Sequence, residues 1–113
     1  KGVLPDVVSY NTALSACHRE GAWNHAMAVL TSMRKSGVDE DVVTYSTLLS
    51  ICERTNHFER AFSYRDKMIA SGIAPNRYVF NALISNCRAA AASVSGYKVR
   101  QEWVEKAFRL QRE

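Results

Sequence analysis

The 113-residue sequence predicts an all-α protein in which antiparallel helix pairs stack into an elongated α-solenoid. Three observations support this fold class: a repeat of about 35 residues, apolar residues at helical spacing within each copy, and no stretch with the alternation of a half-buried strand. One helix pair cannot cover its own apolar face, whereas stacked pairs bury it between neighbours. A superhelical array of repeats is therefore expected.

The repeat becomes visible when the segment that starts at Val7 is aligned with the segment that starts at Val42, an offset of 42 − 7 = 35 residues. Twelve of these 35 positions carry the same residue type in both copies. A third copy opens at Arg77. We assign residues 1–6 to the tail of a preceding repeat, 7–41 to the first repeat, 42–76 to the second, and 77–113 to a third that is truncated at its end.

Each copy predicts two helices. In the first helix of the first copy, apolar residues fall at i, i+3, i+4 and i+7, which is one helical face. This face comprises Tyr10, Ala13, Leu14 and Cys17 in the first copy, Tyr45, Leu48, Leu49 and Cys52 in the second, and Phe80, Leu83, Ile84 and Cys87 in the third. The second helices carry Trp23, Ala26, Met27, Leu30 and Met33, and then Phe58, Ala61, Phe62 and Met68. Ser9 and Thr44 are predicted N-caps, and Gly37 and Gly72 predicted helix stops.

The third copy departs from the pattern between its helices. Cys17 to Ala26 is nine steps, whereas Cys87 to Ala107 is twenty, so 20 − 9 = 11 extra residues lie near positions 89–99. The alanines after Arg88 predict a longer first helix, because alanine has the highest helix propensity. Residues 93–96 then predict a break. The following Tyr97, Lys98 and Arg100 are read either as a contact surface or as part of a passive insertion.

Composition and motifs exclude several classes of function. The formal charge of +4 is compatible with a polyanionic partner but does not require one. The apolar runs are too short to span a bilayer. The three cysteines fall on one face of successive helices, about 8–10 Å apart, so we expect buried thiols rather than a zinc site. No His-x-x-x-His pair, Gly-rich phosphate loop or nucleophile–base set is found, so no enzyme, metal, cofactor or small-molecule substrate is predicted.

The two ends of the repeat carry a family resemblance. The second copy opens VVTYSTLL at Val42 and closes MIASGIAPN at Asn76, and the first copy follows the same frame. This 35-residue helix pair resembles a pentatricopeptide repeat. The tetratricopeptide repeat differs in its 34-residue period and its Trp-Leu-Gly-Tyr signature, which this sequence lacks.

The resemblance implies that the first helices line a groove in which one base of single-stranded RNA is read per repeat. The positions that match the family's base-reading residues are Asn11, Ser46 and Asn81 on the first helices, and Asp41 and Asn76 at the ends of the repeats. The positions that match the residues on either side of the base are Val8, Val43 and Tyr78. Asp6 would close the upstream repeat. In the family's code, Asn11 with Asp41 resembles a uridine reader and Ser46 with Asn76 an adenosine reader.

Purely structural roles remain open for each position: helix capping for Asn11 and Ser46, turn formation for Asp41 and Asn76, and interhelix packing for the valines. The resemblance implies a sequence-selective RNA-binding module of an organellar RNA-processing, stability or translation factor, located in a mitochondrion or plastid. The alternative is a helical scaffold for proteins of an organellar ribonucleoprotein assembly such as a ribosome. A third possibility is the RNA-targeting arm of an enzyme whose catalytic domain lies elsewhere in a longer chain.

Overall fold

The computed structural model describes residues 6–93 and 97–112, and no side chains within 97–100 or 110–112. Six α-helices occupy these residues, and no strand is found among them. The prediction of an all-α fold is confirmed. The helices are α1 (Val7–Glu20), α2 (Trp23–Lys35), α3 (Val42–Arg54), α4 (Phe58–Ala70), α5 (Arg77–Ser93) and α6 (Tyr97–Arg112).

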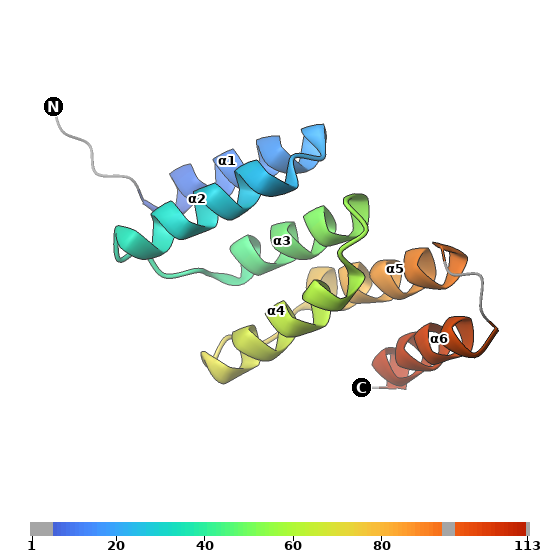
Figure 1. Cartoon of the computed structure of the whole chain (residues 1–113). Coiled ribbons are helices and arrows are strands. Elements are labelled where there is room, and N and C mark those ends of the chain that lie inside the picture. The colour runs from blue at the N-terminus through green and yellow to red at the C-terminus, as the bar shows by residue number, and fades with distance from the viewer. Residues whose placement is uncertain (1–5, 94–96, 113) are drawn as a thin grey trace, which may run out of the picture.

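The helices form two layers, as Figure 1 shows. The first helices α1, α3 and α5 pack side by side in one layer, and each second helix packs against the first helix of its own pair. The principal extents of 56 × 28 × 19 Å describe an elongated body. This arrangement is the predicted α-solenoid, in which each pair contacts only its neighbours.

The first two helix pairs begin with an aspartate cap. Asp6 and Asp41 have extended backbones, and each carboxylate accepts the backbone N–H three residues on, from Ser9 and Thr44 respectively, at 2.9 Å. The prediction of Ser9 and Thr44 as N-caps is therefore wrong. Both residues lie in the first helical turn, because a carboxylate one residue before the helix reaches its unpaired N–H groups.

Left-handed residues end the helices at equivalent places. Gly37 and Gly72 follow the second helices with φ of 73° and 82°, which confirms the predicted stops. Gly21 ends α1 with φ of 64°, and Asn56 adopts nearly the same angle, 63°, at the equivalent turn after α3. Asparagine tolerates this region better than most residues, so the glycine-to-asparagine change between copies keeps the turn.

The predicted interior is confirmed at its central positions. Leu14, Leu49 and Leu83 are completely buried between neighbouring helices. Cys17, Cys52 and Cys87 are also buried, as small apolar residues rather than as members of disulfides. Burial raises the pKa of the Cys52 thiol to about 12 and that of Cys87 to about 11. These thiols are structural and protonated at neutral pH.

Part of the insertion in the third copy is helical. α5 has 17 residues, against 14 in α1 and 13 in α3, because the chain from Ala89 to Ser93 continues the helix. The predicted lengthening by alanine is confirmed. The segment 94–96 lies outside the described residues, as do the side chains of Tyr97, Lys98 and Arg100. Further along α6, Trp103 is buried, with its ring 6.2 Å from that of Phe58 and 6.0 Å from that of Phe62.

Candidate nucleic-acid interface

An apolar side chain is exposed near the start of each first helix. Val8, Val43 and Tyr78 occupy equivalent repeat positions, and they are 66%, 51% and 69% exposed. The interpretation of the two valines as interhelix packing residues is therefore wrong. Exposed apolar side chains cost little singly, but three of them at one repeat position form a row along the first-helix layer. A flat ligand could contact this row.

Where α1 packs against α3, the structure brings two predicted reading residues together. The side-chain amide of Asn11 on α1 donates a hydrogen bond to Oδ1 of Asp41 at 3.1 Å, although the two residues lie 30 positions apart. Asp41 also caps α3, so its position is fixed by the helix start. The predicted turn-forming role and a ligand-binding role are thus compatible in one residue.

A third residue, Thr44, which the sequence predicted only as a helix cap, completes this cluster. The Thr44 hydroxyl oxygen lies 2.6 Å from Oδ1 of Asn11 and 2.9 Å from Oδ1 of Asp41, and it accepts the backbone N–H of Asp41 at 3.1 Å. Thr44 is completely buried. The signal in the sequence was an Asp-x-x-Thr capping box, a reciprocal pair that fixes both side chains.

The cluster favours a charged carboxylate. Partial burial acts to raise the pKa of Asp41, but the hydrogen bonds from the Thr44 N–H and the Asn11 amide outweigh it and lower the pKa below its ordinary value. Hydrogen bonds to the charged form stabilise that form. Asp41 therefore presents an anionic acceptor at neutral pH.

The second repeat arranges its candidate pair differently. The Ser46 hydroxyl donates to the backbone carbonyl of Val43 at 3.1 Å, and Oδ1 of Asn76 accepts the backbone N–H of Val79 at 3.0 Å. No hydrogen bond joins Ser46 to Asn76 within the described part of the chain. Val79 stands where the preceding repeat has Thr44, and it offers no hydroxyl to connect the two side chains.

The second and third repeats share an open depression between α3 and α5. Its volume is about 330 Å³. Three predicted contact residues line it, and most of the remaining lining is polar. The lining residues are Ser46, Tyr78 and Asn81, with Thr47, Ser50, Glu53, Ala82 and Ser85. The hydroxyl and amide groups can hydrogen-bond to a ligand there, and the exposed Tyr78 ring can stack on one.

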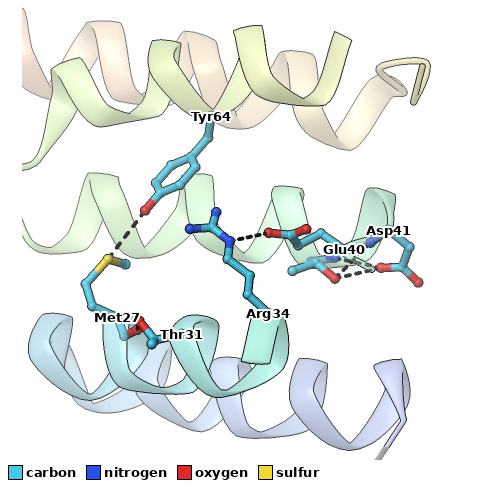
Figure 2. Close-up of polar contacts among 7 residues, drawn as sticks. Met27, Thr31, Arg34, Glu40, Asp41 and Tyr64 are labelled. Carbon is cyan, nitrogen blue, oxygen red and sulfur yellow. Dashed lines mark hydrogen bonds and ion pairs between the residues drawn. The ribbon is translucent and has the colours of Figure 1, made fainter. Parts of the chain in front are cut away.

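The second-helix layer carries a different set of contacts. Figure 2 shows the ion pair of Arg34 with Glu40 at 3.0 Å and the hydrogen bond from the Tyr64 hydroxyl to the sulfur of Met27 at 3.4 Å. Arg34, Arg60 and Lys67 line a cleft of about 340 Å³ between α2 and α4. This cationic cleft was not predicted from the sequence, because no motif relates its residues.

By their geometry alone, residues 6–93 and 97–112 offer neither a metal site nor a membrane-spanning helix. No group of three His, Cys, Asp or Glu side chains there lies close enough to hold a metal ion. None of the helices in these residues combines the length and apolar character that crossing a membrane requires. Arg19, Arg54 and Arg88, which occupy the last turns or late positions of the three first helices, are all exposed.

Comparison with known proteins identifies the repeat. The model of the PPR repeat family matches residues 5–54 and 40–88. The crystal structure of the pentatricopeptide repeat protein PPR10 from maize is 30% identical with a TM-score of 0.71, over 93% of this chain and 14% of that chain. The structure of PPR10 in complex with an 18-nucleotide psaJ RNA element is 25% identical with a TM-score of 0.67, over 97% of this chain and 19% of that chain.

The chain thus spans less than one fifth of the length of these solved structures. No curated protein matches it. The family model covers most of the sequence, and the solved structures share the two-layer arrangement of helix pairs. The chain belongs to the PPR repeat family.

Proposed function

We propose that this chain is a sequence-selective, single-stranded RNA-binding module in which each repeat contacts one base. The observation that carries the proposal is the hydrogen-bonded pair of Asn11 and Asp41, at the two helices that also carry the exposed valines Val8 and Val43. The valines would pack on the two faces of a base, while the polar pair would meet its edge. RNA-binding modules commonly read unpaired bases by this combination of stacking and edge hydrogen bonds.

The chemistry of the first pair suits uracil. The Asp41 carboxylate only accepts hydrogen bonds, so it matches a base edge that donates an N–H, as uracil does at N3. The second N–H of the Asn11 amide can donate to a neighbouring carbonyl oxygen of the same base. Each such contact would contribute on the order of 1 kcal/mol to the discrimination between bases.

The second pair suits adenine. Asn76 carries both donors and an acceptor, and Ser46 is a small donor and acceptor, so the two can serve the mixed edge of adenine. In the third repeat, Asn81 and Tyr78 line the depression beside α3, and the Tyr78 ring offers a face for base stacking. With the chain parallel to the RNA, as in the family, the first two repeats would read U then A from 5′ to 3′.

The wider role follows from the family. A PPR10 structure contains an RNA element, which supports RNA as the ligand of this fold. We place the protein among organellar factors for RNA processing, stability, editing or translation, in a mitochondrion or plastid, with binding rather than catalysis as the task of these repeats. Duplex RNA should bind less well than a single strand, because pairing hides the base edges.

The proposal is tested by selecting bound RNAs from a random-sequence pool with the intact protein. Wild type should enrich uridine at the nucleotide that meets the first repeat, and Asn11→Ala should lose this enrichment while the neighbouring positions keep theirs. Asn24→Ala is the matched control, because Asn24 is exposed on α2 in the other layer. A uniform loss of affinity for all sequences would count against base reading by Asn11.

A protein scaffold is the second candidate, and the cationic cleft between α2 and α4 favours it. Arg60 and Lys67 line this cleft together with Arg34, and an acidic partner could bind there. Reversing the charges with Arg60→Glu and Lys67→Glu should then release the protein from a ribonucleoprotein particle in a sedimentation experiment. An unchanged sedimentation profile, with uridine selection intact, would leave RNA reading as the function.

A further inference from the structure

We infer that Thr44 is a positioning residue for base recognition by the first repeat, although it belongs to the second repeat and is buried out of reach of the RNA. This inference rests on the proposed function. Thr44 would hold Asn11 and Asp41 as one rigid unit with a single donor beside a single acceptor. The selectivity of one repeat would thereby depend on a residue of the next.

The hydrogen-bond chemistry of the cluster permits one arrangement of protons. The Asp41 carboxylate only accepts, so Asn11 must turn its NH₂ group toward it, as the 3.1 Å contact requires. The amide oxygen of Asn11 then faces the Thr44 oxygen at 2.6 Å. Two oxygens this close need a proton between them, and only the Thr44 hydroxyl can supply it. The same hydroxyl accepts the Asp41 N–H, which fixes its rotation.

The arrangement leaves two groups for a ligand. Among the described residues, the second N–H of Asn11 takes no hydrogen bond, and Oδ1 of Asp41 accepts from the Asn11 amide and the Thr44 N–H, so Oδ2 of Asp41 keeps lone pairs for a ligand. One fixed donor beside one fixed acceptor complements the adjacent carbonyl and N3–H of uracil. Thr44 is completely buried, so it acts on the base only through Asn11 and Asp41.

The chain contains its own comparison. Val79 occupies the equivalent position of the next repeat and is also completely buried, so valine fits this space. There Ser46 bonds to the carbonyl of Val43, Asn76 bonds to the N–H of Val79, and the two candidate readers are not joined. The same backbone frame therefore holds a connected pair where the buried residue is threonine and a separate pair where it is valine.

The experiment compares wild type, Thr44→Val and Thr44→Ser. Uridine and cytidine versions of one single-stranded RNA, which differ only at the nucleotide read by the first repeat, are bound to the intact protein. Wild type should prefer uridine, Thr44→Ser should keep the preference, and Thr44→Val should reduce it by roughly three- to tenfold, the effect of one lost hydrogen bond. The effect on affinity of replacing any other nucleotide of the RNA should be the same in all three proteins.

A measurement without RNA separates positioning from general destabilisation. In NMR spectra of the 113-residue chain, the side-chain NH₂ signals of Asn11 should move toward those of a solvated amide in Thr44→Val and stay in place in Thr44→Ser. Unchanged Asn11 signals in Thr44→Val, or an unchanged preference for uridine, would overturn the inference and leave the proposed function standing. A wild-type protein that does not distinguish uridine from cytidine would overturn the proposed reading itself.

Discussion

The indole ring of Trp23 and the imidazole ring of His57 stack face to face, with their centroids 3.7 Å apart and their planes within 9°. Trp23 begins α2 and His57 caps α4, so the stack joins the same edge of two successive repeats. Nδ1 of His57 lies 2.8 Å from the Thr55 hydroxyl, which holds the ring in this orientation. His57 is half-buried in this arrangement.

The stack predicts a stability effect specific to one histidine. His57→Ala should lower the free energy of unfolding by about 1–2 kcal/mol, because it removes an aromatic pair and the hydrogen bond to Thr55. His25→Ala is the control, since His25 is exposed on α2 and should change stability by less than about 0.5 kcal/mol. Urea unfolding monitored by circular dichroism measures both. Equal effects of the two substitutions would argue against the stack.

The layered core predicts a large effect at Leu49, which is completely buried on α3. Leu49→Ala should cost about 2–5 kcal/mol in unfolding free energy through lost burial and a residual cavity. Val43→Ala, on the exposed side of the same helix, should leave stability nearly unchanged and weaken RNA binding instead. Thermal unfolding and filter binding distinguish the two. If Leu49→Ala leaves the free energy of unfolding unchanged, the helix faces are rotated from the positions described.

Conversion of the second repeat is a direct test of the reading pairs. Ser46→Asn with Asn76→Asp should change the preferred nucleotide at that position from A to U without altering the neighbouring positions. Adding Val79→Thr supplies the missing hydroxyl, so the triple variant should discriminate more strongly than the double. Competition binding with RNAs that differ at one nucleotide measures this. If the double variant already prefers uridine as strongly as the first repeat does, the threonine is not needed for this discrimination.

The aspartate caps predict a response to acid. The pKa of Asp41 is lowered in the folded chain, so its stabilising contribution is present above the ordinary aspartate pKa near 4 and is lost as the pH falls through the lowered value. Asp41→Asn keeps the cap without the titration. Unfolding free energies measured between pH 6 and pH 2 should therefore fall less steeply in this variant than in wild type. Parallel curves would show that the charge of Asp41 does not contribute to the free energy of unfolding.

The cysteines predict unreactive thiols. The thiolate is the nucleophile, and burial raises the pKa of Cys52 to about 12 and that of Cys87 to about 11. Iodoacetamide at pH 8 should therefore modify both only when the chain unfolds, with rates that rise on addition of urea. Mass spectrometry of peptides gives the rate at each site. Rapid alkylation of Cys52 in the native protein would show that the α3 face opens without global unfolding.

The sequence alone determined the repeat frame and the faces of the helices. Apolar residues at i, i+3, i+4 and i+7 are local information, so the burial of Leu14, Leu49 and Leu83 followed from spacing. The equivalence of Asn11 with Ser46, and of Asp41 with Asn76, also followed from the 35-residue offset. These features depend on helical geometry that every copy shares.

Only the tertiary structure decided which of these side chains meet. Asn11 and Asp41 lie 30 residues apart and touch because α1 packs against α3, whereas Ser46 and Asn76 share the same spacing and do not touch. The two repeats differ at three of these places, because Asn11 is replaced by the shorter Ser46, Asp41 by Asn76, and the buried Thr44 by the buried Val79. A hydrogen bond depends on distance and angle across a packed interface, and a sequence offset specifies neither, so the polar network required the folded chain.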